Sequence, residues 1–368
     1  MGSEMCIRDS SNLIDDLRKF MGRKPLLEEI SPLEFDSTLG EELLRLLTRR
    51  SSWMPIGDGC HRWLLQHVRT YVPEVYHPIG RFREKREAMR RRRILITGLT
   101  GQLSRAFQQQ LASTDTVIML GRPDVDMRDW TAVRDCVAIH QPDIVIHAAA
   151  MTDVDGCEQE PDVAWVLNAA ATRNVAQASA RVGALLIYIS TNYVFDGSKA
   201  VAYHEFDTPN PISVYGASKL AGELEARLAT ESCFVIRTAW IYAPEGHNFM
   251  LTMRRLMAER ERISVVSDQF GNPTLASDLA SGVLQIIERA PFGTYHVTNA
   301  GSTSWFEWAA EIARLIGSPV EVDPIAGTEY SRAATPPANG MLESLMLPRL
   351  GIAMPDWRDA LKRGLETS

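Results

Sequence analysis

Cysteine is scarce in this sequence, with five in 368 residues. The five are widely separated, form no C-x-x-C pair and have no regularly spaced histidines near them: Cys6, Cys60, Cys136, Cys157 and Cys233. A disulfide framework or a zinc site needs cysteines grouped at characteristic spacings, so neither is supported. We expect reduced thiols and no catalysis through cysteine.

Long apolar runs are missing as well. No run approaches the roughly 18–20 residues that cross a bilayer, and the N-terminus lacks a basic segment followed by an apolar secretory stretch. The net charge is −7, from 39 Lys and Arg against 46 Asp and Glu. This balance gives no reason to expect nucleic acid or an anionic membrane as a partner. The expectation is a cytoplasmic protein without membrane insertion.

Residues 1–92 carry helical periodicity but no recognisable functional motif. The first ten, MGSEMCIRDS, have no period and resemble a leader that is unrelated to the fold. Apolar residues then recur at helical spacing to about residue 71, and residues 81–93 are dense in Arg and Lys, which is typical of a solvated helix or linker. We predict a mainly helical N-terminal extension, which could be a docking element, the remnant of an upstream domain or the product of a wrongly fused gene prediction.

The pattern changes at residue 93. Short apolar runs at 93–98, 116–120, 143–150, 184–190 and 233–240 alternate with helix-like stretches at 104–112, 162–182 and 213–228. Strands that alternate with helices favour a doubly wound parallel sheet with helices on both faces. We therefore predict an α/β fold in which residues 93–240 form a Rossmann dinucleotide-binding domain.

A glycine-rich turn follows the first predicted strand, with the sequence Gly98-Leu-Thr-Gly101-Gln-Leu-Ser104. The glycines let the main chain approach a pyrophosphate, whose charge faces the N-terminus of the next helix. Ser104 stands where a third glycine is usual, and is small enough for the helix to pack closely on the strand. The predicted cofactor contacts from this turn are Gly98, Thr100, Gly101, Gln102 and Leu103.

Arg122 follows the second predicted strand, where an acidic residue would hold the ribose 2′-hydroxyl of NAD. Arginine can instead pair with the 2′-phosphate of NADP. The sequence thus favours NADPH, with NADH as the alternative. The predicted cofactor set also includes Asp126 and Met127 near the adenine, the small residues Ala148, Ala149 and Ala150 after the third strand, and Tyr215 and Lys219 later in the chain.

Tyr215-Gly-Ala-Ser-Lys219 places a phenol and an ammonium one helical turn apart on the same face. A nearby positive charge lowers a tyrosine pKa, so the phenol can exchange a proton nearer neutrality. Thr191 follows the apolar run that ends at Ile189, and the carboxyl ends of parallel strands are where such sheets bind ligands. We predict that Thr191, Tyr215 and Lys219 are catalytic: Tyr215 protonates a carbonyl oxygen that Thr191 also contacts.

These segments, in this order, resemble the extended short-chain dehydrogenase/reductase superfamily and, within it, the dTDP-4-dehydrorhamnose reductase family. The resemblance runs from about residue 93 to residue 365. It rests on GLTGQLS at 98–104, AAAMTDVDGCEQEP at 148–161, STNYVFDG at 190–197, PNPISVYGASKLAGE at 209–223, RTAWIYA at 237–243 and DQFGNPT at 268–274.

The resemblance implies an oxidoreductase that transfers hydride from NADPH to the C4 ketone of dTDP-4-dehydro-L-rhamnose, in carbohydrate biosynthesis. Tyr215 would donate the proton, and Lys219 would hold the nicotinamide ribose. Residues 241–368 would be mainly a smaller part that binds the sugar nucleotide, with some segments returning to the Rossmann domain. The implied sugar contacts are Thr152, Val154, Asn192, Tyr193 and Trp240.

The chain could also form a homodimer. Members of the family can use Mg²⁺ at a subunit contact, but no carboxylates in this sequence have a spacing that would locate such a site. Three positions depart from the family pattern: Asn192 replaces an aspartate, Met151 an aromatic or polar residue, and Ser104 a glycine. The alternatives are another nucleotide-sugar reductase or epimerase of the superfamily, and a non-catalytic NADP-binding regulatory subunit.

Overall fold

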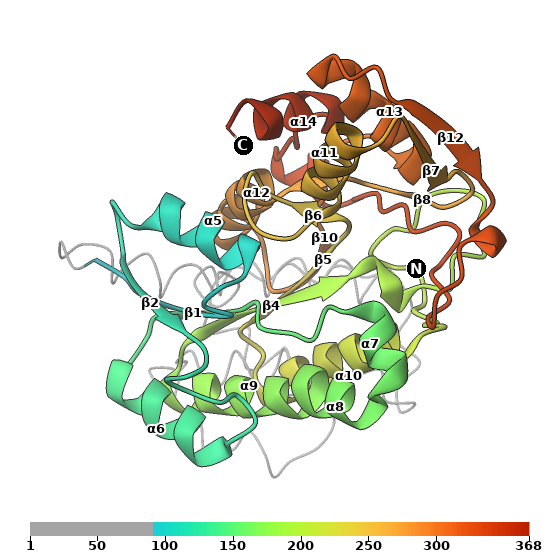
Figure 1. Ribbon diagram of the computed structural model, residues 1–368. Helices are drawn as coiled ribbons and strands as arrows, with labels where there is room; N and C mark the ends of the chain where they lie inside the picture. The colour runs from blue at the N-terminus through green and yellow to red at the C-terminus, as the bar shows by residue number, and fades with distance from the viewer. Residues whose placement is uncertain (1–90, 368) are drawn as a thin grey trace, which may run out of the picture. The chain divides into compact units, whose positions relative to one another are not determined.

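The computed structural model describes residues 91–367, drawn in colour in Figure 1. The predicted helical extension lies outside these residues, apart from its last two. Within the described range, no helix is both long enough and apolar enough to span a bilayer.

The centre of the described chain is a six-stranded sheet in the order β10-β5-β4-β3-β1-β2, in which every neighbouring pair is parallel. The predicted doubly wound parallel sheet is confirmed. The sixth strand, β10, did not stand out among the apolar runs of the sequence. The strands are β1 (Arg93–Thr97), β2 (Thr116–Leu120), β3 (Ile144–His147), β4 (Leu185–Thr191), β5 (Cys233–Thr238) and β10 (Gly293–His296).

Helices cover both faces of the sheet (Figure 1). One face carries α5 (Gln102–Leu111) and α12 (Ala276–Arg289); the other carries α6 (Trp130–His140), α9 (Ala171–Val182) and α10 (Val214–Ala229). Neighbouring residues of β1 belong to different cores, because Ile94 and Ile96 pack on one side and Leu95 on the other. Burial on both faces explains why the strands are continuous apolar runs rather than alternating ones.

The helix predicted over 162–182 is interrupted. The chain forms α7 (Val154–Gln159), α8 (Pro161–Trp165), a π-helical turn η2 (Val166–Ala170) and then α9. Asn168 lies in η2, and its side chain accepts a hydrogen bond from Met151 N (2.8 Å) and donates to Met151 O (3.1 Å) and Ser218 Oγ (3.0 Å). π-helical turns frequently occur at functional sites, and this one turns a buried amide toward the predicted active-site segments.

Other boundaries shift slightly from the predicted ones. Helix α5 begins at Gln102 rather than Ser104, β3 ends at His147, and β4 continues to Thr191 rather than stopping at Ile189. The alanines 148–150 therefore lie outside the sheet, while Thr191 is its last residue on β4.

Most of the chain after residue 240 builds a second core around Trp308 and Trp357. β7 pairs with β12, β8 with β11 and β6 with β9, whereas α12 and β10 return to the Rossmann layers. The elements are β6 (Ile241–Tyr242), α11 (Phe249–Glu259), β7 (Arg262–Val266), β8 (Phe270–Gly271), β9 (Thr274–Leu275), β11 (Thr303–Ser304), α13 (Trp305–Ile316), β12 (Glu321–Ile325), η4 (Gly327–Glu329), η5 (Pro348–Leu350) and α14 (Trp357–Glu366).

Helix α10 approaches β4 and η2 very closely at Gly222. A Cβ at this position would lie 2.2 Å from Tyr188 Oη and 2.5 Å from the carbonyl oxygen of Asn168. The Tyr188 hydroxyl donates to the main-chain oxygen of Lys219 (3.1 Å). The absence of a side chain at 222 thus sets how near the Tyr-Lys helix lies to the sheet.

We predict that Gly222→Ala lowers the free energy of unfolding by about 1–3 kcal/mol, because overpacking a rigid contact outweighs the gain in helix propensity. Urea unfolding would measure it. Gly282→Ala in α12 is the matched control, since the nearest atom there is the sulfur of the flexible Met354 side chain at 2.8 Å, so a smaller loss is expected. A Gly222→Ala protein as stable as the wild type would refute the constraint.

Candidate active site

The predicted cofactor residues that follow β1 and β3 lie at the point where the strand order reverses. β1 lies between β2 and β3, so the chain leaves β1 on one side and enters β3 on the other. Doubly wound sheets bind ligands at this switch point, outside the carboxyl ends of the strands. Gly98 has φ +89°, and a Cβ there would lie 3.1 Å from Ala149 N. The turn after β1 and the alanines after β3 are therefore neighbours.

The glycine-rich turn packs closely on its strand. Ser104 Oγ donates to the carbonyl oxygen of Thr97 (3.1 Å), so the serine permits the close helix–strand contact that was expected of it. The Leu103 side chain is buried in the core, which leaves only its main-chain groups for a cofactor. Thr100 and Gly101 are exposed at the tip of the turn.

The Gln102 side chain connects the turn to the C-terminal part of the chain. Its Nε2 donates to the main-chain oxygen of His247, and its Oε1 accepts from Asn248 Nδ2, both at 2.8 Å. Arg105 forms an exposed ion pair with Glu245 in the same loop (3.1 Å). The sequence did not predict this link between the cofactor turn and the segment 245–248.

The residues predicted to contact the 2′-phosphate (Arg122) and the adenine (Asp126 and Met127) differ in their surroundings. Arg122 is exposed after β2. Asp126 forms an ion pair with Arg128 (2.5 Å), whose hydrogen bonds lower the pKa of this carboxyl to about 2. The Met127 side chain is buried in the core on the α6–α9 side of the sheet. Arg122 is therefore the member of this group with an exposed charged side chain.

The structure brings Thr191, Tyr215 and Lys219 together. Ser213 caps α10 by accepting from Gly216 N (3.1 Å), so the helix begins at Val214 and Tyr215 lies in its first turn. β4 ends at Thr191, and the Thr191 side chain acts to lower the pKa of the Tyr215 phenol, so the two groups are neighbours. Lys219 follows one turn along the same helix.

Lys219 is almost completely buried, at 3% exposure. Its Nζ donates to the carbonyl oxygen of Ile189 (2.7 Å) and lies 4.2 Å from the centroid of the Tyr188 ring, a cation–π distance. Burial lowers the pKa of Lys219 to about 7, and the charge of Glu223 opposes this shift. The ammonium therefore titrates near neutrality.

The pKa of Tyr215 is raised, not lowered as the sequence suggested. Burial is the main cause, and the hydrogen bond with Thr191 acts in the opposite direction without overcoming it. A charged phenolate loses more solvation energy in the interior than a neutral phenol does. At neutral pH the phenol keeps its proton, which is the state that a proton donor needs.

A buried polar chain behind the site was missed at the sequence level. His147 Nδ1 pairs with Thr97 Oγ1 (2.7 Å), and His147 Nε2 pairs with Thr172 Oγ1 (3.1 Å). Thr172 donates to Asn168 O (2.7 Å), and Ala149 N donates to Thr97 Oγ1 (3.1 Å). Burial lowers the pKa of His147 to about 3. The ring is therefore neutral at physiological pH. Because Thr172 gives its hydroxyl proton to Asn168 O, its oxygen accepts from His147, and Nε2 carries the ring proton. The one sequence signal was a histidine at the end of an apolar strand.

Asn192 begins the short 3-10 turn η3 (Asn192–Val194) and is 2% exposed. Its Nδ2 donates to the main-chain oxygen of Gly340 (3.0 Å), while its Oδ1 accepts from Thr191 Oγ1 (3.3 Å). The amide thus joins a predicted catalytic hydroxyl to a segment almost 150 residues later in the chain. A carboxylate, which has no proton at neutral pH, could not donate to Gly340.

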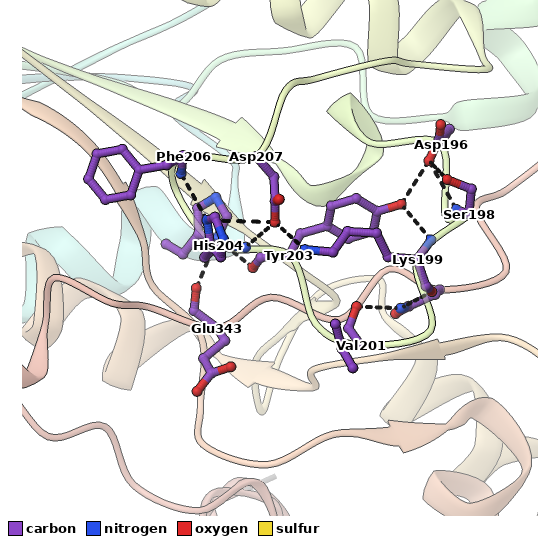
Figure 2. A network of polar contacts seen from close by, with 11 residues as sticks. Asp196, Ser198, Lys199, Val201, Tyr203, His204, Phe206, Asp207 and Glu343 are labelled. Carbon is purple, nitrogen blue, oxygen red and sulfur yellow. Dashed lines mark hydrogen bonds and ion pairs between the residues drawn. The ribbon is translucent and has the colours of Figure 1, made fainter.

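The segment around Gly340 is held by the loop 196–207. Asn339 Nδ2 donates to the carbonyl oxygens of Lys199 (2.7 Å) and Val201 (2.9 Å). Figure 2 shows the Tyr203 hydroxyl between Asp196, to which it donates (2.7 Å), and the main-chain nitrogen of Lys199 (3.2 Å). The loop therefore has a defined shape of its own, and it positions Gly340 against Asn192.

The predicted sugar-contacting residues lie around Tyr215 to different extents. Tyr193 meets the Tyr215 ring edge-on, with centroids 5.4 Å apart, and Val154 packs against the same small cluster. Thr152 is exposed just before α7. Trp240 lies outside this cluster and packs against the second core instead.

Trp240 is half-buried and adopts a left-handed conformation, with φ +44°. It stacks on Trp305 with centroids 3.6 Å apart, and a Cβ at Gly271 would lie 2.4 Å from its ring. A non-glycine residue at such a φ is uncommon and is held by its surroundings. Trp305 was not singled out in the sequence, because nothing there relates it to Trp240.

Residues 92–368 match the family model described as the RmlD substrate binding domain. The chain belongs to this family. Among its relatives, the spore coat polysaccharide biosynthesis protein SpsK of Bacillus subtilis is 38% identical over 275 residues, covering 74% of this chain and 97% of the relative. The dTDP-4-dehydrorhamnose reductase of Burkholderia thailandensis is 39% identical over 287 residues, covering 73% and 96%.

A solved structure of this RmlD family is also similar. The dTDP-4-dehydrorhamnose reductase of Bacillus anthracis, crystallised in complex with NADP, has 41% identity and a TM-score of 0.74, covering 76% of this chain and all of that one. The RmlD-family resemblance inferred from the motifs is thereby confirmed.

The lowered pKa of Lys219 allows a test of whether its charge is needed in the site of this RmlD-family protein. Because the pKa is lowered to about 7, we expect kcat/KM for NADPH to fall as the pH rises through about 7, as the ammonium loses its charge. Glu223 raises the pKa of Lys219, so Glu223→Gln should move the fall to lower pH. Initial rates across a pH series would measure both profiles.

Stability provides the control. A lysine whose pKa is lower in the folded than in the unfolded chain makes unfolding harder as the pH rises from about 7 toward its ordinary value. The contribution of Lys219 to stability thus rises while activity falls, and thermal unfolding across the same pH series separates the two. A kcat/KM that is flat between pH 6 and 9 would contradict the role given to Lys219.

Proposed function

We propose that the protein uses NADPH to reduce the C4 ketone of dTDP-4-dehydro-L-rhamnose to dTDP-L-rhamnose. The observation that carries the proposal is that Thr191, at the carboxyl end of β4, lies beside Tyr215 in the first turn of α10, with Lys219 one turn further along that helix. The relatives named dTDP-4-dehydrorhamnose reductase support the choice of substrate.

The residues of the switch point suit a dinucleotide. Gly98 and Gly101 let the turn pack tightly, since a Cβ at Gly98 would lie 3.1 Å from Ala149 N and one at Gly101 would lie 3.2 Å from Gly98 O. Ala148, Ala149 and Ala150 add little bulk beside it. NADPH bound there would supply the hydride. Thr100, Gln102, Leu103, Asp126 and Met127 stay in the proposed cofactor set, with Leu103 and Met127 acting through main-chain atoms.

Tyr215 and Thr191 would stabilise the charge that develops on the ketone oxygen. The protonated phenol donates its proton to that oxygen, and the Thr191 hydroxyl would turn its single proton away from Asn192 Oδ1 to give the same oxygen a second hydrogen bond. Lys219 uses one of its three donors on Ile189 O, which leaves others for the nicotinamide ribose and for the Tyr215 oxygen after proton transfer. The charge on Lys219 favours the phenolate that results.

Sugar binding is proposed for the residues around Tyr215, with support that differs among them. Tyr193 and Val154 pack beside the phenol, and Thr152 and Trp240 would add contacts at the edges. Asn192 is buried and bonded to Thr191, so it would act through the orientation of that hydroxyl.

We also propose that the two parts of the chain bind different ligands. Residues 93–240 would hold the cofactor and residues 241–368 mainly the sugar nucleotide. The return of β10 to the sheet and the packing of α12 on α5 support the expectation that some later segments belong to the Rossmann part.

A homodimer and a cytoplasmic location stay predictions. Exposed apolar side chains on α8, η2 and α10, which pack side by side, offer a face that a second copy could cover: Val163, Trp165, Val166, Leu224 and Leu228. Mg²⁺ is not part of the proposal, since residues 91–367 contain no group of three or more His, Cys, Asp or Glu arranged to bind a metal.

The central test is Tyr215→Phe. With dTDP-4-dehydrorhamnose made in situ, the wild type should oxidise NADPH, and the variant should lose about 10²–10⁴-fold in kcat because it lacks the proton donor. NADPH affinity, followed by the fluorescence of the reduced nicotinamide, should stay near that of the wild type. Full activity in the variant would show that another group donates the proton.

The wild-type assay also separates the alternatives. A protein that binds NADPH without oxidising it in the presence of this substrate would point to another sugar or to a regulatory subunit. Cofactor that remains bound as NAD through purification would favour an epimerase.

Arg122→Ala tests the cofactor preference. If Arg122 pairs with the 2′-phosphate, its removal should raise KM for NADPH about tenfold or more, the size expected for a charged hydrogen bond, and leave KM for NADH unchanged. Steady-state rates with both cofactors measure this. Equal changes in KM for the two cofactors would show that Arg122 does not bind the 2′-phosphate.

A further inference from the structure

An ion pair connects the C-terminal part of the chain to the catalytic edge of the sheet. Arg332 Nε lies 3.1 Å from Asp155 Oδ1, and Ala334 N donates to the same oxygen (2.8 Å). Asp155 lies in the first turn of α7, just after the cofactor alanines. The two side chains are 24% and 36% exposed, so the pair is accessible from solvent yet partly enclosed.

Arg332 also reaches the residue beside the catalytic phenol. Burial raises the pKa of Tyr193, and the charge and hydrogen bond of Arg332 oppose that shift. Tyr193 in turn meets the Tyr215 ring edge-on. The guanidinium and the carboxylate therefore lie near the two phenols, and Val154, which precedes Asp155, packs with Tyr193 in the cluster around Tyr215.

This combination of groups matches the chemistry of a sugar. A hydroxyl group both donates and accepts, and a carboxylate accepts while a guanidinium donates in a planar fork. Asp155 has a second carboxylate oxygen, and Arg332 has further N–H donors besides Nε. A neutral polyol can thus be bound by this pair without the pair having to separate.

We propose that Asp155 and Arg332 bind hydroxyl groups of the sugar and so determine which sugar nucleotide the site accepts. The inference rests on the proposed function, because it places the sugar ring next to Tyr215. It assigns the sugar, rather than the diphosphate or the base, to the space beside Tyr193.

The experiment compares two ligands on the protein saturated with NADP⁺. Calorimetry would give the affinities for dTDP-L-rhamnose and for dTDP, which lacks the sugar. Arg332→Ala should weaken the affinity for dTDP-L-rhamnose by about tenfold or more, the size expected for lost charged hydrogen bonds. The affinity for dTDP should stay within about twofold of the wild-type value. Asp155→Asn should give a smaller loss, since the amide keeps one acceptor oxygen.

Turnover adds a second readout. In both variants KM for the sugar nucleotide should rise more than kcat falls, and KM for NADPH should not change. Arg332→Lys keeps the charge but not the planar fork, so it should recover only part of the affinity. Arg314→Ala is the matched control, because Arg314 pairs with Glu311 on α13 through the same kind of contact and should leave both affinities unchanged.

Three outcomes decide the matter. Equal losses for dTDP and dTDP-L-rhamnose in Arg332→Ala would overturn the assignment to the sugar, and so would no loss for either. If the wild-type protein neither turned over the substrate nor bound dTDP-L-rhamnose more tightly than dTDP, the proposed function would be overturned. The role given to Asp155 and Arg332 would then have no basis either, because it requires a sugar nucleotide in the site. A loss confined to dTDP-L-rhamnose supports the assignment.

Discussion

The contact between α10 and β4 is the constraint on which the rest of the site depends. At Gly222 the helix comes so near that any side chain would meet Tyr188 and Asn168. This approach lets the Tyr188 hydroxyl bind the main chain of Lys219 and places the Lys219 ammonium over the Tyr188 ring. One close packing contact therefore sets the position, the burial and hence the pKa of Lys219, the lysine proposed for the active site.

A buried ion pair supports that contact. Glu223 follows Gly222 on the helix, accepts from Ser190 Oγ on β4 (2.6 Å) and pairs with Arg237 on β5 (2.7 Å). A buried charge without a partner is costly, so helix and both strands must keep their relative register for the pair to form. The same carboxylate favours the charged form of Lys219 against the effect of burial. Structural support and proton chemistry thus share one residue.

The sequence was sufficient to predict the parallel sheet and the placement of Tyr215 and Lys219 on one helix face, because both depend on local patterns. Apolar runs buried on both faces mark parallel strands, and the spacing of Tyr215 and Lys219 places them on one helix face whatever surrounds them. It was insufficient where the outcome depended on distant segments. The direction of the Tyr215 pKa shift depends on burial, and η2 interrupts a continuous helical pattern because Asn168 binds Met151 and Ser218.

By itself, then, the sequence determined the α/β class, and it predicted the cofactor turn and the pair Tyr215 and Lys219, because each depends on residues close together in the chain. Thr191 was predicted from its place at the end of an apolar run. Only the tertiary structure decided that Gly340 holds Asn192 and that Arg332 reaches Asp155. These partners come from segments about 150 and 180 residues apart, and no local period records such a meeting. It follows from how the second core packs beside the Rossmann sheet.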